Sequence, residues 1–410
     1  MEPIVKVSAG LDVHRKNVVA TILSEQDDGS VHEDTREFGT FLKSRKQLRR
    51  WLLKHDVELV VMESTGIYWK AIYSALERTG LNVYVVNARH AKNLPGRKTD
   101  VQDSKWLATL ARFGLLSPSF IPPEDLRELR LITRRRMKLQ GILSAEKNRL
   151  HKILDDAGIR LGAVVSDING VSAQAIIDGL ICGQSPDQLM EHVRGRLKVK
   201  IPELLESVKG TISQRHILLL RQIRGHIGYL EQDLMELDQY IIAAMSPYQQ
   251  QWEILQTIPG IDKISAASIL VEIGIDMKRF GSMGRLASWA GMCPGNNESA
   301  GKRKSGRTRK GNRAIRQILC EASNSARRTK TQFQAKYKGL VIRRGHKRAI
   351  MAIGHKMLRI IYTLLLKNEP YRDSTVDYEL LIVQRNAPRW IRALKEFGFL
   401  PECQQDCSSC

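Results

Sequence analysis

The order of apolar segments in the first part of the chain constrains the fold more than any other feature. Three segments rich in Val, Ile and Thr come first, VKVSAGLDV, NVVATILS and VHEDTREFG, and the polar QDDGS between the second and third is typical of a turn. Helical patterns then alternate with apolar runs: helix 41–56, strand 57–63, helix 67–78, strand 81–86 and a helix that begins near Asp100. The run VELVVME is typical of a buried central strand. We therefore expect a mixed sheet with helices packed on it.

Four acids fall at the ends of these expected elements. Asp12 closes the first strand and Glu63 closes the apolar run. Asp100 and Asp103 stand three residues apart near the start of the last helix, so their carboxylates face one side. Three strands followed by helix, strand, helix, strand and helix is the order of a ribonuclease H-like fold, in which the first and fourth strands are neighbours. In that fold Asp12 and Glu63 lie side by side.

Converging carboxylates repel one another unless hard cations bind them through oxygen, and Mg²⁺ is the usual cation. Two such ions ~4 Å apart can stabilise the attacking and leaving oxygens at a phosphate. We therefore predict a Mg²⁺ site, with two ions, formed by Asp12, Glu63, Asp100 and Asp103. An ordinary explanation also exists, since Asp100 can cap the helix and Asp103 can complement its dipole. Glu63 is harder to explain in this way, because a carboxylate that ends an apolar strand is unfavourable unless something binds it.

Two long helical segments occupy the middle of the chain. After a proline-marked break at 115–123, residues 124–156 form one expected helix, which carries three nucleic-acid-binding candidates, Arg134, Arg135 and Arg136. Short helices are expected over 159–205. The second long helix, 211–245, has the apolar spacing of a coiled-coil heptad seam: Leu220, Ile223, Ile227, Leu230, Leu234, Leu237 and Ile241. The two helices can pair within one chain, between chains or both, and so long a seam favours self-association.

A third region begins after Pro247. The stretch WEILQTIPGIDKISAASILVEIG resembles a helix-hairpin-helix element, in which backbone amides at the turn can hold a phosphate. Gly260 is therefore a nucleic-acid-binding candidate, although an ordinary tight turn explains the PGI motif equally well. Further helices are expected at RLASWAGMCP, 315–325 and 348–366. The domains that we expect are 1–118, 119–250, 251–345 and 346–410.

The charge balance indicates a polyanionic partner. The chain has 65 Lys and Arg against 43 Asp and Glu, a net charge of +22 and a pI near 9.9. A basic surface kept for solubility is the alternative. The N-terminus lacks a secretory pattern, and no apolar run approaches the roughly 20 residues of a bilayer span, so we expect a cytoplasmic protein without a membrane partner. The terminal Cys403, Cys407 and Cys410 suit a fraying tail better than a metal site.

A basic stretch, GNNESAGKRKSGRTRKGN at 295–312, contains a candidate nucleophile, Ser299. A serine hydroxyl is a poor nucleophile unless a base or a metal lowers its pKa, and no histidine lies near it in sequence. Activation by the metal site is then the natural route, and a loop serine that makes a turn hydrogen bond is the alternative. Because the acids and Ser299 are far apart in the chain, the site is hypothesised to be completed between subunits. Seven cations that follow it are candidate phosphate ligands: Lys302, Arg303, Lys304, Arg307, Arg309, Lys310 and Arg313.

These motifs resemble the insertion-sequence-110 family of transposases, which are bridge-RNA-guided recombinases. GLDVH, MESTG and KTDVQDS match that family's RuvC-like domain with its Asp-Glu-Asp-Asp tetrad. IPGIDKISAASIL and FGSMGRLASWAGMCPGNNESAGKRKSGRTRKGNRAIRQIL match its second transposase domain, and the middle of the chain is similar to its coiled-coil region. The resemblance covers most of the chain, apart from about the last sixty residues. The tetrad and the SAG loop are specific together and weak alone.

The resemblance implies a recombinase whose nucleophile is Ser299. In that family the acidic tetrad with Mg²⁺ and the serine cleave a DNA strand and hold it as a phosphoserine before strands are exchanged and rejoined. The partners implied are double-stranded donor and target DNA, a non-coding bridge RNA that pairs with both, and further copies of the chain, as a dimer and a dimer of dimers on DNA. Sequence specificity would then reside in base pairing, which suits a protein with dispersed Lys and Arg.

Two other functions are compatible with the sequence. The first is a metal-dependent RuvC-like nuclease or Holliday-junction resolvase, in which water attacks the phosphate and Ser299 has no chemical part. The second is a nucleic-acid-binding protein without enzymatic activity that has kept the fold. Four acids argue against the second, because carboxylates that face DNA phosphates without a metal weaken binding. A Ser299→Ala variant separates the recombinase from the nuclease.

Overall fold

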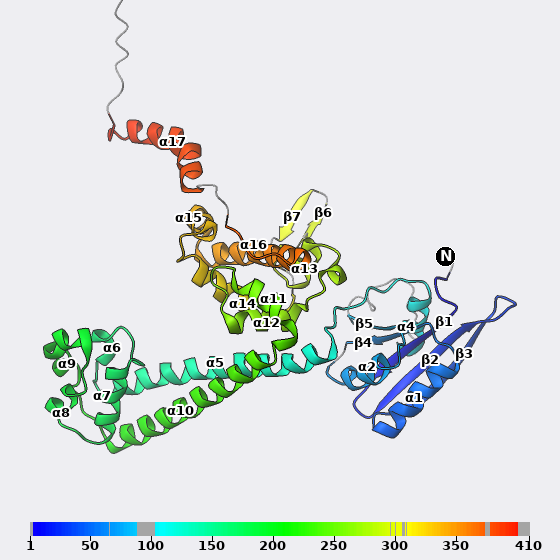
Figure 1. The fold of residues 1–410 in the computed structure, drawn as a ribbon, viewed down its shortest axis with the longest axis horizontal. Helices are drawn as coiled ribbons and strands as arrows, with labels where there is room; N and C mark the ends of the chain where they lie inside the picture. Colours follow the sequence, from blue (N-terminus) through cyan, green and yellow to red (C-terminus); the bar gives the residue numbers. More distant parts are fainter. Residues whose placement is uncertain are drawn as a thin grey trace, which may run out of the picture. The chain divides into compact units, whose positions relative to one another are not determined.

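The structure is a computed structural model, and it describes residues 3–64, 66–87, 103–295, 297–299, 301–305, 308, 310–373 and 378–400. The chain forms two compact units, residues 1–124 and 125–410 (Figure 1). The first contains the sheet, and the second is almost entirely helical. The finer division of the chain into four domains stays a prediction.

The first unit has a five-stranded sheet with the order β3-β2-β1-β4-β5. The pairs β1–β2 and β2–β3 are antiparallel, whereas β1–β4 and β4–β5 are parallel. This order is the ribonuclease H-like arrangement that the sequence predicts, with the first and fourth strands as neighbours. The strands are β1 (Val7–Val13), β2 (Asn17–Glu25), β3 (Val31–Gly39), β4 (Leu59–Glu63) and β5 (Val83–Val86).

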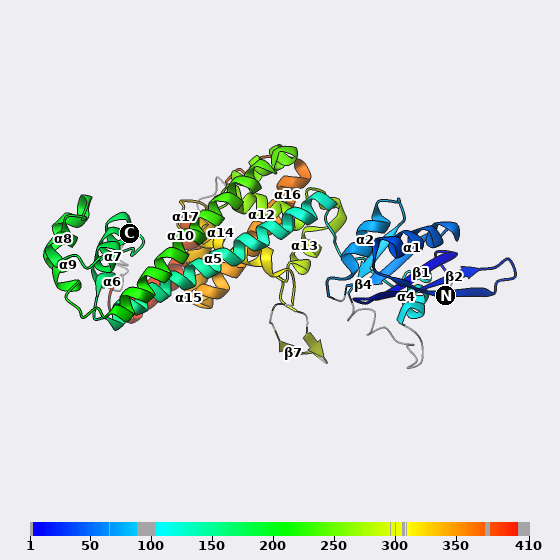
Figure 2. The same ribbon diagram turned by 90° about the horizontal axis from the view of Figure 1, so that it is seen from below.

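Helices cover both faces of this sheet. Because successive side chains of a strand point to opposite faces, Ala9 and Leu11 of β1 pack with α1 (Leu42–Lys54) and α2 (Trp69–Glu77) in one buried core. Ser8 and Gly10 face the other side, where α4 (Asp103–Arg112) lies against β1 (Figure 2). Here Val61 and Val86 pack against Leu107 and Leu110 of α4 in a second core.

In the second unit, α5 (Glu124–Asp156) and α10 (Gln214–Ala243) lie side by side (Figures 1 and 2). The expected seam is turned inward: Leu220, Ile227, Leu230 and Leu234 share a buried core with Leu139, Leu143, Leu150 and Leu154 of α5. Arg136 pairs with Asp238, and Lys147 pairs with Glu231. Residue numbers thus rise along α5 as they fall along α10, so the two helices are antiparallel. The two helices therefore pair within the chain. A supercoil and self-association stay predictions.

A group of short helices connects the distal ends of α5 and α10. Val165, Ile176, Leu189 and Leu204 of this group extend the core between the two long helices. Its elements are α6 (Leu161–Val164), α7 (Val171–Ile181), α8 (Pro186–Met190), η1 (Gly195–Lys200) and α9 (Ile201–Ser207).

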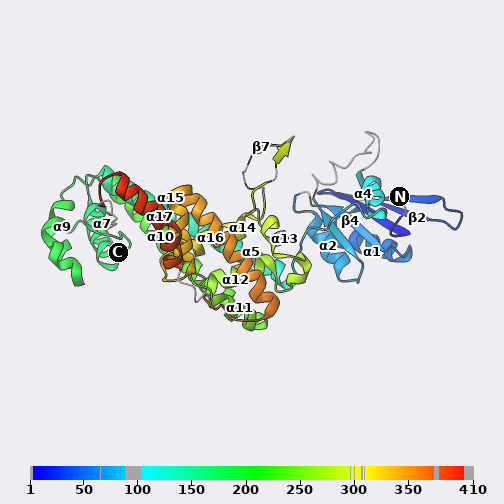
Figure 3. The ribbon, with the colours of Figure 1, turned by 90° about the horizontal axis from the view of Figure 1, so that it is seen from above.

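Most of the remaining helices of the second unit pack around α12 (Lys263–Ile273), which is buried over most of its length, and α16 (His346–Lys367) (Figure 3). Helix α16 packs against α13, α14 and α15, so its residues belong to the same body as those that precede it. Among the described residues, α16 is the one helix long and apolar enough to cross a membrane, and half of its most apolar window is buried. The elements are η2 (Ser246–Tyr248), α11 (Gln249–Gln256), α12 (Lys263–Ile273), η3 (Met277–Phe280), α13 (Met283–Trp289), β6 (Asn297–Ser299), β7 (Lys302–Ser305), α14 (Arg313–Ala326), α15 (Gln332–Arg344), α16 (His346–Lys367) and α17 (Tyr378–Glu396).

Candidate active site

Asp12 and Glu63 end neighbouring parallel strands. The register between β1 and β4 pairs Gly10 with Val61 and Leu11 with Met62. The next residue of each strand is an acid, so their Cα atoms are neighbours across strands that lie about 4.8 Å apart. By the alternation of the strands, both acids belong to the face that α4 covers. The predicted adjacency of these two acids is confirmed.

Helix α4 begins at the same end of the sheet. The Ser104 hydroxyl lies 2.8 Å from that of Thr21, which is opposite Gly10, and the Ser8 hydroxyl donates to the Ala108 carbonyl at 3.0 Å. Further along, the Ile4 amide donates to the Arg112 carbonyl at 2.8 Å. In these contacts the residue numbers rise along α4 as they fall along the strand, so α4 runs antiparallel to β1. Its first residue, Asp103, therefore lies toward the strand end that carries Asp12.

Gly10 makes this close approach possible. A Cβ atom at this position would lie 2.0 Å from the Ser104 carbonyl oxygen and 2.5 Å from the Ala108 amide nitrogen. Only a residue without a side chain lets the helix backbone rest directly on the strand. The glycine in GLDVH therefore sets the height of α4, and with it the height of Asp103, above the two strand-end acids.

A histidine that the sequence analysis missed adjoins this set. His14 Nε2 lies 3.0 Å from Asp12 Oδ2, and its side chain is more than half exposed. The spacing in GLDVH was the available signal, since residues two apart at a strand end share a face. His14 thus gives the Asp12 carboxylate a partner in the protein.

The donor chemistry of the acids fits a hard divalent cation. Asp12, Glu63 and Asp103 are partly exposed carboxylates, the ligand type that Mg²⁺ prefers. In the described part of the chain, no three Asp, Glu, His or Cys side chains lie close enough together to hold a metal ion. The fourth predicted ligand, Asp100, lies outside the described residues, as do the terminal cysteines. The acids fit by type and by placement on the fold, and the metal site stays a prediction.

The predicted basic loop contains a β-hairpin. Strands β6 and β7 are antiparallel, with Ser299 opposite Lys302 and Asn297 opposite Ser305 (Figure 1). Gly301, with φ of +72°, lies at the reversal, and a bridge between Pro294 and Thr308 extends the pairing toward the base. The hairpin therefore holds the backbone of Ser299 at its tip.

Three of the seven predicted phosphate ligands follow the serine on β7 of this hairpin. Lys302, Arg303 and Lys304 are described by their backbone in β7, whereas Arg307 and Arg309 lie outside the described residues. Lys310 is exposed where the chain leaves the hairpin, and Arg313 is exposed at the first turn of α14. The role of all seven in binding phosphates stays a prediction.

The base of the hairpin is attached to a buried carboxylate. Asn312 caps α14 by accepting hydrogen bonds from the amides of Ala314 and Ile315, and its own amide group donates to Glu272 Oε2 at 2.6 Å. Glu272 is 1% exposed and also pairs with Arg130 and Arg134 of α5. Burial lowers the pKa of Arg130 to about 10, against the opposing effect of Glu272. One carboxylate thus joins α5, α12 and the end of the serine hairpin.

Of the three consecutive candidate arginines in α5, residues 134–136, two pair with carboxylates of the second unit. Arg134 makes a bidentate pair with Glu272 at 2.8 and 3.0 Å, and Arg136 makes one with Asp238. Both have structural partners that account for them without nucleic acid. Arg135 is exposed and stays a candidate phosphate ligand.

Gly260 has a packing role in the turn between α11 and α12. Its φ is +86°, and an added Cβ would lie 2.4 Å from the Ala322 carbonyl oxygen and 2.7 Å from the Ala326 nitrogen of α14. Asp262 caps α12 by accepting from the Ser265 amide at 2.7 Å. Since α14 packs against this turn at Gly260, close helix packing explains the glycine, and phosphate binding there stays a prediction.

Two family profiles match this chain, and together they cover more than half of it. Residues 9–159 match a family described as a transposase, of the DEDD type of IS110. Residues 252–338 match the family described as Transposase IS116/IS110/IS902. The first match contains the four acids and the second contains the serine hairpin.

Individual relatives share about a quarter of their residues with this chain. The chain is 24% identical over 348 residues to the transposase for insertion sequence element IS1111A of Coxiella burnetii, a match that covers 82% of this chain and 86% of the relative. It is 26% identical over 301 residues to an uncharacterized 42 kDa protein of insertion element IS900 of Mycobacterium paratuberculosis, covering 68% and 74%. Among solved structures, RuvC of Thermus thermophilus is 15% identical with a TM-score of 0.22, covering 28% of this chain and 99% of that one.

Proposed function

Since the chain belongs to the IS110 family of transposases, we propose that it cuts and rejoins DNA strands through a covalent phosphoserine at Ser299. The observation that carries the proposal is the register that makes Asp12 and Glu63 neighbours on the face where α4 begins with Asp103. Both family matches support it, because one contains these acids and the other contains the serine.

Asp12, Glu63, Asp100 and Asp103 would hold the divalent cations. When bound, such cations lower the pKa of a hydroxyl and stabilise negative charge on the phosphate oxygens. The protein's own contribution is to place the carboxylates on rigid elements, two at strand ends and one at the start of a helix that Gly10 seats on the sheet. His14 would orient Asp12.

In the proposed reaction, Ser299 Oγ attacks the phosphorus of a DNA phosphodiester and loses its proton. A bond forms between Oγ and phosphorus, and the bond from phosphorus to one ester oxygen breaks. That ester oxygen takes up a proton and leaves as a hydroxyl. A hydroxyl of another strand reverses the step, releases Ser299 and restores the phosphodiester, so no external energy source is needed.

The net charge of +22 and the cations around the hairpin support nucleic-acid partners. We propose that these are donor and target DNA and a non-coding RNA that pairs with both, and that the protein works in the bacterial cytoplasm where the DNA lies. Assembly as a dimer and a dimer of dimers on DNA is part of the same proposal. An active site shared between subunits would combine the acids of one subunit with Ser299 of another subunit.

The test is a trapping assay with purified protein, Mg²⁺, end-labelled DNA carrying the element's junction and RNA transcribed from the flanking non-coding region. We expect labelled DNA at the mass of the protein on a denaturing gel. It should be lost in Ser299→Ala and in Asp12→Asn. Ser305→Ala, on the opposite strand of the same hairpin, and Asp28→Asn, in the turn between β2 and β3, are the matched controls and should keep it.

Two results would reject the proposal. Cut DNA without a protein-linked product, undiminished in Ser299→Ala, would identify a nuclease in which water attacks. A protein-linked product that persists in Asp12→Asn would separate the serine from the acids. Omission of the RNA tests guidance on its own, since trapping at the chosen site should then fall to background.

A further inference from the structure

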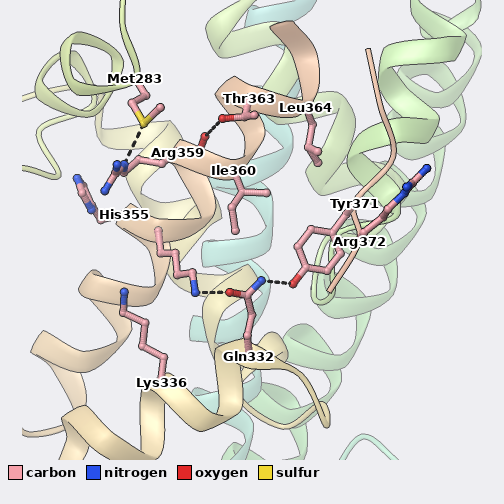
Figure 4. Close-up of a pocket in the computed structure, with 11 residues that line it drawn as sticks. Met283, Gln332, Lys336, His355, Arg359, Ile360, Thr363, Leu364, Tyr371 and Arg372 are labelled. Atoms are coloured by element: carbon pink, nitrogen blue, oxygen red, sulfur yellow. Dashed lines mark hydrogen bonds between the residues drawn. The ribbon is translucent and has the colours of Figure 1, made fainter. Parts of the chain in front are cut away.

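A cavity of about 470 Å³ lies in the second unit, lined by α16, the start of α15 and the segment after α16 (Figure 4). Its volume is within the range of small-molecule sites. None of its lining residues belongs to the acidic set or to the serine hairpin. The proposed chemistry therefore leaves the cavity without a role.

One wall of the cavity is cationic. His355, Lys356 and Arg359 of α16 line this wall. The amino group of Lys336 on α15 extends toward His355 and Arg359 (Figure 4). Burial, followed by the charges of Arg359 and Lys336, lowers the pKa of His355. Burial also lowers the pKa of Lys356. The wall thus gathers like charges, an arrangement that an anion would stabilise.

Two cations of this wall donate hydrogen bonds to uncharged acceptors. Arg359 Nε donates to the Met283 sulfur, an uncharged acceptor, at 3.1 Å. Lys356 Nζ donates to the amide oxygen of Gln332, with the charge of Asp373 near enough to act on it. The Gln332 amide donates in turn to the Tyr371 hydroxyl at 2.7 Å. These contacts fix the positions of both cations on the wall.

A second wall of the cavity is apolar and aromatic. Ile360 and Leu364 continue the same face of α16, one and two turns beyond Lys356. The ring of Tyr371 faces them across the cavity in Figure 4 and stacks on Phe333, with centroids 5.9 Å apart. The Tyr371 hydroxyl also donates to Asp373 Oδ1 at 2.8 Å. A free inorganic anion would use only the cationic wall. A nucleotide has both a phosphate and a flat base, and it matches both walls.

We propose that this cavity binds one unpaired nucleotide of a nucleic-acid strand, with its phosphate at Lys356 and Arg359 and its base against Ile360, Leu364 and Tyr371. The inference rests on the proposed function only in that a nucleic acid is the partner. Stacking of a base on an aromatic side chain contributes about 1–3 kcal/mol and tolerates any base. The cavity would therefore hold a strand without reading its sequence, which suits a protein whose specificity lies elsewhere.

The test is fluorescence anisotropy with labelled oligothymidylate, and with oligouridylate as a second probe, at several salt concentrations. The double variant Lys356→Gln and Arg359→Gln should weaken binding about tenfold or more and reduce the salt slope by about 0.7 for each phosphate that the cavity no longer binds. The matched control is Arg343→Gln with Arg344→Gln, an equal change of charge at the exposed end of α15, and it should change affinity less than about twofold.

A second pair of variants tests the apolar wall without changing the charge. Tyr371→Leu should weaken binding about tenfold, whereas Tyr371→Phe keeps the ring, loses only the hydrogen bonds of the hydroxyl, and should bind more tightly than Tyr371→Leu. Thymidine monophosphate should displace the probe, and inorganic phosphate at the same concentration should not. Thermal unfolding of each variant shows whether a loss of binding is a loss of fold.

The proposal is overturned if both double variants lose affinity equally, because net charge alone would then explain binding. It is also overturned if inorganic phosphate competes as well as the nucleotide, or if Tyr371→Leu binds normally. These results are distinct from failure of the proposed function. If the protein forms no phosphoserine but the cavity variants have the expected effects, the nucleotide-binding proposal stands and the recombinase proposal fails. If trapping is normal but the cavity variants have no effect, the recombinase proposal stands and the nucleotide-binding proposal fails.

Discussion

The side-chain amide of Asn312 donates a 2.6 Å hydrogen bond to the buried carboxylate of Glu272. Asn312 caps α14 at the end of the serine hairpin, and Glu272 lies in α12 where Arg130 and Arg134 of α5 reach it. The carboxylate therefore connects the scaffold of the second unit to the segment that carries Ser299. A change at Glu272 is expected to act on stability and on the hairpin together.

Glu272→Gln keeps the shape of the side chain and removes its charge. Arg130 is then a largely buried cation without its carboxylate, so we expect the free energy of unfolding of the second unit to fall by about 3–5 kcal/mol. Urea denaturation measures this. Asp276→Asn, which removes the exposed pair with Arg279, is the control and should change stability by less than about 1 kcal/mol. Equal effects of the two changes would mean that Glu272 is not the central contact.

Gly10→Ala tests the seating of α4 on the sheet. The new methyl group would meet the backbone of Ser104 and Ala108, which cannot rotate away, so we expect a loss of about 3 kcal/mol or more in the first unit. Gly141→Ala is the control, since an added Cβ at that position of α5 meets nothing and a helix favours alanine over glycine by about 0.5–1 kcal/mol. A Gly10→Ala variant as stable as the wild type would show that α4 can move away from β1.

The features of the fold and of the candidate site that could be predicted from the sequence are those that depend on local pattern or on strand order. Those that depend on contacts between distant residues could not be predicted. Helix α5 runs from Glu124 to Asp156 as expected, because nothing in that stretch breaks a helix. The neighbours Asp12 and Glu63 were also foreseeable, because strand order alone places them. Arg134 was not, since its partner Glu272 is 138 residues away and no local pattern marks the pair.

The serine hairpin and α17 were also hard to predict, because local sequence patterns do not mark either element. The segment Lys302–Ser305 has no apolar alternation, so its strand arises from pairing with Asn297–Ser299 and not from a hydrophobic face. Helix α17 has many exposed apolar side chains, including Leu380, Leu381 and Trp390. None of the side chains of α17 that the structure describes is buried, so the apolar residues of this segment do not mark a face that packs on a core.

Tyr248 gives a prediction for alkaline pH. Its hydroxyl donates to Asp125, and burial, followed by that contact, raises its pKa from 10.0 to about 12. The folded state therefore favours the protonated phenol. Its contribution to stability is fully present below pH 10 and is lost as the pH rises toward 12.

The measurement is the difference in unfolding free energy between the wild type and Tyr248→Phe. It should be constant, at about 0.5–1.5 kcal/mol, up to pH 10 and shrink between pH 10 and 12. Tyr229→Phe, at an exposed position of α10, is the control and should show no such trend. A difference that stays constant to pH 12 would contradict the contact with Asp125.

Arg135 and Arg136 are adjacent on α5 but are expected to do different things. Arg136 makes a bidentate pair with Asp238, so Arg136→Ala should lower the free energy of unfolding by about 1.5–3 kcal/mol and leave nucleic-acid affinity nearly unchanged. Arg135 is exposed, so Arg135→Ala should change stability by less than about 0.5 kcal/mol. If Arg135 contacts a phosphate of duplex DNA, its loss should reduce the slope of log K against log salt by about 0.9. Each variant is the control for the other, because both remove one positive charge from the same turn. Equal losses of affinity would mean that the helix acts through net charge alone, and a loss confined to Arg136→Ala would mean that its pair with Asp238 opens to bind DNA.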